Sequence, residues 1–433
     1  MIQDLLQFLN ESPVNFLAVN SIKTRLEQAG YTAFDPTAPL GGPLKPGEKF
    51  YVTKNDSSIY AFHIGKEPLA EKGIHLICAH CDSPTFRIKP HPELHTSDGS
   101  IRLNTEVYGG PILSTWFDRP LSLAGRVILR TDDPMAPETR LLFVRRPLLV
   151  IPNLAIHFNR QVNDGVKLSK QKDMLPILGY ITEKMEEDGL LKNLIAQELK
   201  VEADDILDFD LYLYDVTPAC LVGLHNEYVS SGRLDDLSMV HAGMEALLAN
   251  GQPPATTKVL AIFDNEETGS QTKQGAASPF LSSMLQRIVA VQGGSTDDYC
   301  RCVEKSFMVS ADNAHAWHPN YGEKYDLTNH PRMGGGPVIK FNAAQKYASD
   351  AVSSAIFASI CQRAGVPCQN FVNHSDVAGG STLGNILASS LPLRGVDMGN
   401  PIWAMHSVRE TGAVSDHEYC IRAFTEFFSQ GQG

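Results

Sequence analysis

The chain has 433 residues, and its 37 Lys and Arg against 49 Asp and Glu give a formal net charge of -12. This length predicts a large core and more than one domain. An acidic chain is a poor partner for nucleic acid or an anionic membrane, and no apolar run approaches the ~20 residues of a membrane span. The amino terminus lacks the basic start of a signal peptide and the eight cysteines are scattered, so we predict a cytoplasmic protein with reduced thiols.

The first 90 residues alternate helix and strand signals. Apolar spacing predicts helices around residues 5–9 and 19–29 and a strand at 60–64. A second strand, 74–79, ends in His80, Cys81 and Asp82. Cys78 and Cys81 form a Cys-x-x-Cys pair that could serve redox chemistry or structural zinc, but no second pair completes a tetrahedral set, so we disfavour this interpretation.

The middle of the chain has a different pattern of secondary-structure signals. Strand and turn signals dominate from residue 91 to 230, with apolar runs at 107–113, 123–129, 140–144, 147–152 and 209–214 and a charged helix at 182–200. We predict a mainly β domain of residues 91–230, inserted into a domain made of residues 1–90 and 231–433. The alternating helices and strands of the latter predict an α/β protein with a three-layer sandwich.

Several predicted strands end in acidic residues or histidine. The run 259–263 is typical of a buried strand and is followed by acids, and the runs 307–311 and 402–405 are followed by an acid and a histidine. A helix with an apolar stripe opens at Asp235, although that residue could simply be its N-cap, and adjacent glutamates are more often solvated loop residues. Because ligands bind at the carboxyl ends of parallel strands, we expect these side chains to share one site: His80, Asp82, Asp235, Asp264, Glu266, Glu267, Asp312 and His406.

This inventory matches a centre with two metal ions. Such a centre needs one bridging carboxylate, with one histidine and one further carboxylate on each ion. Asp235 can bridge, His80 and Asp312 can complete one ion, and Glu267 and His406 can complete the other. Mixed nitrogen and oxygen ligands suit zinc, with cobalt and manganese as alternatives.

Two acids remain for other roles. Asp82 follows His80 by two residues and can brace its imidazole, and Glu266 can face the bridging water as general base. A serine hydrolase is disfavoured, because the string His374-Ser-Asp376 is contiguous and no Gly-x-Ser-x-Gly elbow is present.

The motifs together resemble a known family. In order they are Ala79-His-Cys-Asp82, Ile151-Pro-Asn-Leu-Ala-Ile-His157, Ser231-Gly-Arg-Leu-Asp235, Asp264-Asn-Glu-Glu-Thr-Gly-Ser270, Asp312-Asn-Ala-His-Ala-Trp-His-Pro-Asn-Tyr321, Gly336-Pro-Val-Ile-Lys340 and Ala404-Met-His-Ser-Val-Arg-Glu410. Over essentially the whole chain, the sequence resembles the aspartyl aminopeptidase family of co-catalytic zinc metallopeptidases. The resemblance implies two zinc ions per subunit and removal of an amino-terminal residue, Asp or Glu, from peptides with a free amino terminus.

The resemblance also implies an assembly. In similar proteins the inserted domain mediates dimerisation, and a histidine matching His157 reaches the neighbouring active site to stabilise the tetrahedral intermediate. The family typically forms a dodecamer built from dimers, so a homo-oligomer is expected. From the residues alone, His157 is more often structural, and a direct zinc ligand is a further alternative.

Substrate recognition rests on the resemblance as well. Lys340 matches the position expected to meet an acidic substrate side chain, and we also assign His315 to substrate binding; composition alone would make Lys340 a surface lysine. The sequence departs from the animal enzymes at Asp236 and at residues 373–381. One alternative is therefore an aminopeptidase that prefers neutral residues. Two separate alternatives are a related dinuclear deacylase or carboxypeptidase and a catalytically inactive scaffold.

Overall fold

The computed structural model describes residues 1–180, 189–249 and 251–431, which form two compact units. The first comprises Met1–Asp82, Ala219–Met405 and Glu410–Gly433, and the second comprises Ser83–Pro218 and His406–Arg409. The chain therefore passes between units after Asp82 and Pro218, earlier than the boundaries placed at 90 and 230 from the sequence. No helix in the described part of the chain is long and apolar enough to cross a membrane.

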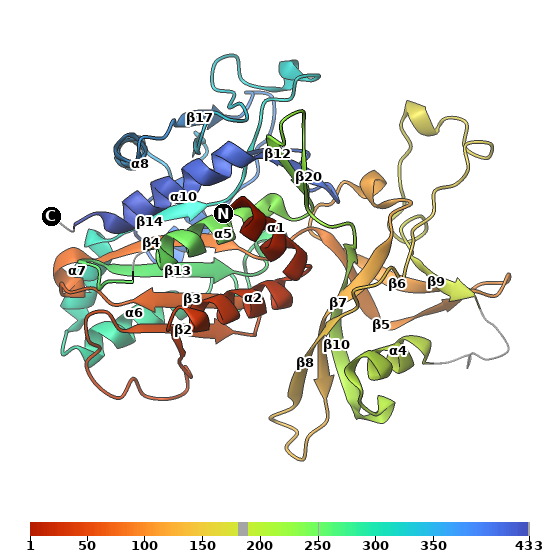
Figure 1. The fold of residues 1–433 in the computed structure, drawn as a ribbon, viewed down its shortest axis with the longest axis horizontal. Helices are drawn as coiled ribbons and strands as arrows, with labels where there is room; N and C mark the ends of the chain where they lie inside the picture. Colours follow the sequence, from red (N-terminus) through yellow and green to blue (C-terminus); the bar gives the residue numbers. More distant parts are fainter. Residues whose placement is uncertain (181–188, 250, 432–433) are drawn as a thin grey trace. The chain divides into compact units, whose positions relative to one another are not determined.

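A nine-stranded mixed sheet forms the centre of the first unit (Figure 1). Its strands β13, β4, β14 and β18 are parallel neighbours, while β3 and β16 pair antiparallel with the two outer members of this group. In spatial order the sheet contains β1 (Thr32–Ala33), β2 (Lys49–Lys54), β3 (Ser58–His63), β13 (Thr257–Phe263), β4 (Ile74–His80), β14 (Phe307–Ala311), β18 (Arg394–Gly399), β16 (Val338–Phe341) and β17 (Gln369–Val372).

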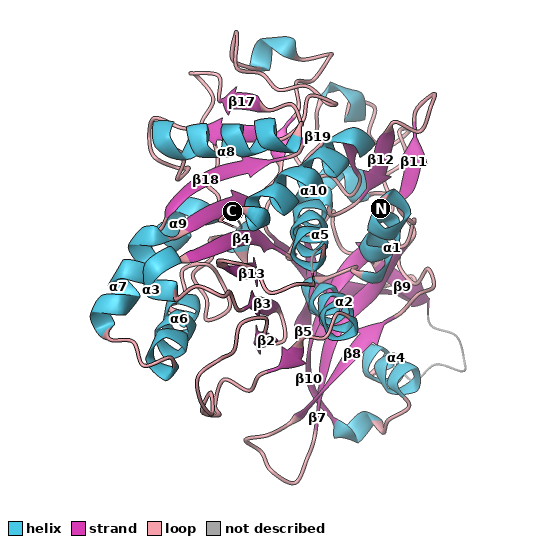
Figure 2. Cartoon of the chain, turned by 60° about the vertical axis from the view of Figure 1, so that its left-hand side comes forward, coloured by secondary structure: helices cyan, strands magenta, loops and turns pink. Residues whose placement is uncertain are grey.

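Helices cover both faces of this sheet, which gives the three-layer α/β sandwich predicted from the sequence (Figure 2). On β4, Ile77 and Ala79 pack into one core and Leu76 and Cys78 into the other, as the two-residue period of a strand requires. The first core contains α1 (Ile2–Glu11), α2 (Asn15–Gln28), α5 (Leu234–Leu248), α8 (Ala351–Ala364) and α10 (Val414–Ser429). The second contains α3 (Leu69–Lys72), α6 (Phe280–Val291), α7 (Thr296–Lys305) and α9 (Leu383–Ser390).

Local sequence signals explain where these helices begin and end. In α7 the Ser295 hydroxyl accepts from the Asp298 N–H and the Asp298 carboxylate accepts from the Ser295 N–H, a reciprocal capping box. Asp350 and Ser353 form the same motif in α8, which ends at Gly365 in the left-handed conformation that glycine adopts without strain.

A smaller five-stranded sheet corrects one sequence prediction. Residues 402–405 were expected to extend the main sheet, but β19 (Pro401–Trp403) lies in a separate sheet and ends before Ala404. β19 pairs with β20 on one side and with β15 on the other. The sheet runs in the order β11 (Cys220–Val222), β12 (Tyr228–Ser231), β20 (Glu410–Ala413), β19 and β15 (Ala314–His315).

The second unit is built on a six-stranded antiparallel sheet. Its order is β8 (Glu138–Phe143), β7 (Leu121–Leu129), β10 (Ile206–Asp215), β5 (Thr85–His95), β6 (Ser100–Tyr108) and β9 (Ile177–Tyr180), and α4 (Leu190–Leu199) packs into its core. The run 107–113, with its strand and turn signals, contains the end of β6 at Tyr108, then Gly109 and Gly110, and the start of a 3-10 turn at Leu113–Trp116. Residues 182–188 of the predicted helix lie outside the described residues.

Candidate metal centre

Three parallel strands of the first unit end side by side in candidate ligands. In the β13–β4 ladder Phe263 is paired with His80, so the carboxyl ends of these strands meet at the same edge. Asp312 follows β14, the neighbour of β4 on its other side. Asp235 and Asp236 reach the same place from the first turn of α5, where both have non-helical backbone angles.

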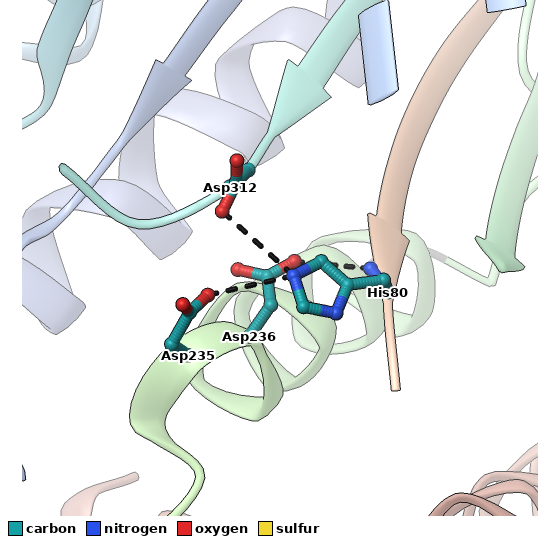
Figure 3. A group of neighbouring side chains, drawn as sticks. All are labelled: His80, Asp235, Asp236 and Asp312. Carbon is teal, nitrogen blue, oxygen red and sulfur yellow. Dashed lines mark hydrogen bonds and ion pairs between the residues drawn. The ribbon is translucent and has the colours of Figure 1, made fainter. Parts of the chain in front are cut away.

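His80 lies among three aspartates (Figure 3). Its Nε2 is 3.4 Å from Asp235 Oδ1 and 3.8 Å from Asp312 Oδ1, and its backbone N–H donates to Asp236 Oδ2 at 3.0 Å. One ligand atom from each of the four residues lies within 4.8 Å of the others, and all four residues are buried. Sequence reasoning treated Asp236 only as a family difference, because adjacent acids at a helix start are ordinary there.

The hydrogen bond on the other side of the ring identifies the nitrogen that faces the aspartates. His80 Nδ1 lies 3.0 Å from the main-chain carbonyl oxygen of Asp82, which can only accept. Nδ1 must therefore carry a proton, so in the neutral ring Nε2 presents a lone pair. A lone pair facing two carboxylates is unfavourable unless a proton or a metal ion lies between them. Burial would lower the pKa of His80, but hydrogen bonds to Asp235, Asp312 and Asp82 outweigh it and raise that pKa well above 6.5.

The Asp82 carboxylate holds the loop that follows β13. Its Oδ1 accepts the N–H of Glu266 and its Oδ2 accepts the N–H of Glu267, both at 3.1 Å. Oδ1 also lies 3.4 Å from His80 Nδ1. One buried carboxylate thus fixes both the imidazole and the two glutamates, whose loop begins with Asn265 in the left-handed conformation.

The two glutamates add further acidic groups beside His80. Ligand atoms of His80, Glu266 and Glu267 lie within 4.8 Å of one another, and the carboxylates of Asp235 and Glu267 approach within the same limit. Burial raises the pKa of the Glu266 carboxyl to about 9; His80 opposes this rise, and the carboxylates of Asp312, Glu267 and Asp82 add to it.

Lys340 is a buried cation beside this cluster rather than a surface residue. It lies inside β16 with only 3% exposure, and its Nζ is 3.2 Å from Asp312 Oδ2. Burial alone would lower the pKa of Lys340, but Asp312 and other acids raise it. One lysine cannot balance the surrounding carboxylates, so the donor set fits a bound divalent cation, with the oxygen and nitrogen ligands that zinc, cobalt and manganese accept.

The remaining candidate residues are three histidines. His315 is exposed in β15, with its ring 5.9 Å from that of Phe371. His406 belongs to the short segment that groups with the second unit, where its Nδ1 lies 3.1 Å from the carbonyl oxygen of Gly110. His157 is exposed in a turn of the second unit. The roles of all three stay predictions.

The cysteine pair has no part in the candidate centre. Cys78 and Cys81 are buried free thiols, and Cys81 Sγ contacts the carbonyl oxygen of Ser57 at 3.1 Å. None of the metal-capable clusters found among the described residues includes a cysteine.

The fold and this cluster of buried acids around one histidine define a class of metal-dependent hydrolases, and comparisons with known proteins identify the family. Residues 8–428 match the family of Aminopeptidase I zinc metalloproteases, M18, and the chain belongs to it. It is 50% identical over 425 residues to a probable M18 family aminopeptidase 2 of Clostridium acetobutylicum, covering 98% of each chain.

Two solved structures are similar over almost the whole chain. One, the cryo-EM structure of the Ape4 and Nbr1 complex, has a TM-score of 0.95 at 36% identity and covers 99% of this chain and 85% of that one. The other, the structure of the S. cerevesiae mApe1 dodecamer, has a TM-score of 0.86 at 25% identity, with coverage of 99% and 96%. Family membership supports a zinc aminopeptidase, which agrees with the donor set at His80.

Proposed function

We propose that the chain is a dinuclear zinc aminopeptidase that removes amino-terminal Asp or Glu from peptides. The observation that carries the proposal is the buried cluster in which His80 meets Asp235 and Asp312, with Glu266 and Glu267 held beside it by Asp82. Bound zinc polarises a carbonyl and lowers the pKa of water towards ~7.

The proposed ligand sets follow from the cluster and the sequence. His80 and Asp312 would hold one ion, Glu267 and His406 would hold the other, and Asp235 would be shared between them. Two observations support Asp235 as the bridge: its carboxylate approaches both His80 and Glu267, and its backbone N–H is anchored to Glu410 Oε2 at 3.0 Å.

Glu266 is the proposed general base. Asp82 holds its backbone beside Glu267, so the two adjacent side chains can serve different functions. Glu266 takes the proton of the attacking water and returns it to the leaving amine, two transfers of the kind that positioned carboxylates perform. Burial makes the Glu266 carboxylate a strong proton acceptor, and a cation bound beside it would favour the ionised form that acts as a base.

The preference for acidic residues rests on Lys340. An ammonium group has three N–H donors, and that of Lys340 forms an ion pair with Asp312, whose Oδ2 lies 3.2 Å from Nζ. The remaining donors can meet a substrate carboxylate, and burial strengthens such a charged hydrogen bond. His315 is proposed to contact the substrate as well.

We further propose a cytoplasmic homo-oligomer built from dimers and reaching a dodecamer, the assembly named for the similar mApe1 structure. The free thiols of all eight cysteines support the location. The loop around His157 supports an interface, because its side chains Leu154, Ile156 and Phe158 are 61%, 51% and 80% exposed. His157 would then act in the active site of the neighbouring subunit.

Peptides that begin with Asp, Glu or Leu, each with a free or an acetylated amino terminus, test the function with protein loaded with zinc, cobalt or manganese. We expect hydrolysis of free Asp and Glu peptides only. The Lys340→Met variant should lose the Asp and Glu preference, while the exposed-lysine control Lys324→Met keeps it. If Lys340→Met slows all peptides equally, Lys340 only positions Asp312, and if no metal gives cleavage, the catalytic proposal is wrong.

A further inference from the structure

At the opposite ends of the same strands, basic residues form a row across the main sheet. In the register of the strands Lys49 is opposite His63, His63 is opposite Lys258, and Lys258 is opposite His75. Directly opposed side chains share a face, and their Cβ atoms lie roughly 4.5–5.5 Å apart. Four strands therefore present four basic side chains at one level on the face that packs against α1, α2, α5 and α10.

If all four side chains were protonated, such a row would be unfavourable, since like charges directly opposite each other repel. Two of its members are nonetheless deeply buried: His63 is 0% and Lys258 is 2% exposed. The pKa of His63 is lowered to about 4 by burial and then by Lys49 and Lys258, and that of His75 is lowered to about 4 by burial and then by Lys258. Lys258 also has a lowered pKa, caused by burial and by Lys49.

The row contains buried polar atoms that have no hydrogen-bond partner among the described residues. Both ring nitrogens of His63 and Nδ1 of His75 are buried and have no hydrogen-bond partner in the described chain. The hydroxyl of Tyr31 is in the same state, and the Tyr31 ring packs edge-on to His63 at 6.4 Å. Buried polar groups almost always form hydrogen bonds with protein, water or an ion. We therefore expect a bound water or ion to supply the missing partners of this cluster.

The carboxyl ends of nearby helices only partly stabilise the charges of Lys49 and Lys258. Lys49 Nζ donates to the carbonyl oxygen of Ala29 at 3.3 Å, at the carboxyl end of α2. Lys258 Nζ lies 5.5 Å from the ring centre of Phe428 near the carboxyl end of α10, and no carboxylate of the described residues pairs with it. Helix carboxyl ends favour cations, but they supply only a fraction of a charge and leave the imidazoles unsatisfied.

We propose that this row, with His63 and Lys258 at its centre, binds an oxyanion of the size and charge of inorganic phosphate. The oxygens of such an anion can accept from the Lys258 ammonium and from the His63 and His75 rings on the neighbouring strands. Binding draws protons onto the two imidazoles, because a negative charge beside them stabilises their protonated forms.

The anion site is separate from the candidate metal centre. His75 and His80 stand at opposite ends of β4, five residues apart in an element that rises about 3.3 Å per residue. The inference therefore does not depend on the proposed peptidase reaction, and its experiment needs no turnover.

Calorimetric titration of the full-length, zinc-loaded protein with inorganic phosphate in a phosphate-free buffer tests the inference. Phosphate can also bind zinc, so the comparison is between variants that share the metal centre. We expect Lys258→Met to weaken binding at the row tenfold or more, while Lys54→Met, at the far end of β2 from Lys49, leaves it unchanged. Equal isotherms for the wild type and Lys258→Met would overturn the proposal.

A measurement on the wild type keeps the test decisive if Lys258→Met fails to fold. In protein with isotopically labelled histidine rings, phosphate should raise the pKa of His63 and His75 above about 4, while the ring of the exposed His225 is unaffected. If neither buried ring responds at saturating phosphate, water alone satisfies the row and the inference is wrong.

Discussion

Acidification should destabilise the first unit through its buried histidines. His63 and His75 have folded pKa values of about 4 against an ordinary value of 6.5. A histidine whose pKa is depressed in the fold stays neutral there while the unfolded chain takes up a proton. Their contribution to stability is therefore intact above pH 6.5 and is lost as the pH falls from 6.5 to about 4.

The size of the loss follows from the shift. At pH 5, about 1.5 units below the ordinary value, each of the two histidines costs about 2 kcal/mol. Together they remove about 4 kcal/mol, a large share of the roughly 5–15 kcal/mol that stabilises a typical domain. Replacing His63 with Leu should halve this loss, and it sacrifices no hydrogen bond, because neither ring nitrogen has a partner in the described chain.

Urea unfolding at pH 7 and pH 5 in phosphate-free buffer measures the effect. The free energy of unfolding of the wild type should fall by about 2 kcal/mol more than that of His63→Leu over this interval. The control His225→Leu, which changes an exposed histidine, should behave as the wild type does. An unchanged pH dependence in His63→Leu would refute the reasoning, since loss of metal at pH 5 affects all three proteins alike.

Two further outcomes concern the metal centre. Asp82→Asn removes the negative acceptor that holds the Glu266 and Glu267 backbone, so zinc affinity in a competition titration should fall about 10- to 100-fold, and unaltered affinity would exclude this role. Removing the metal with a chelator leaves Asp312 and its neighbouring acids with Lys340 as their main counter-charge. Chelation should therefore lower the thermal unfolding midpoint. An unchanged midpoint would show that these acids do not need a bound cation.

Much of the centre could be predicted from the sequence. A short apolar run predicts a buried strand, and an acidic residue directly after it marks the end of the strand at which the site lies. This holds for β4, β13 and β14, which are adjacent and parallel and bring His80 close to Asp312. The same pattern failed for β19, since a local apolar run does not specify which sheet the strand joins.

Other features depend on tertiary structure and leave no local signal. Lys340 follows an apolar run, and only the fold shows that it is buried against Asp312. Asp236 resembles an ordinary acid in the first turn of a helix until its carboxylate is seen at the backbone of His80. The basic row at His63 and Lys258 exists only through strand register, which brings together residues far apart in the chain.

The most direct test of the central claim compares zinc-loaded wild type with Glu266→Gln on one peptide, with its amino terminus free or acetylated. The wild type should release the first residue of the free peptide only. Glu266→Gln should keep the zinc content of the wild type and lose turnover by about 10²- to 10⁴-fold, because the amide cannot take the proton of water. Full activity in that variant, or equal cleavage of the acetylated peptide by the wild type, would contradict a metalloaminopeptidase that uses Glu266 as its base.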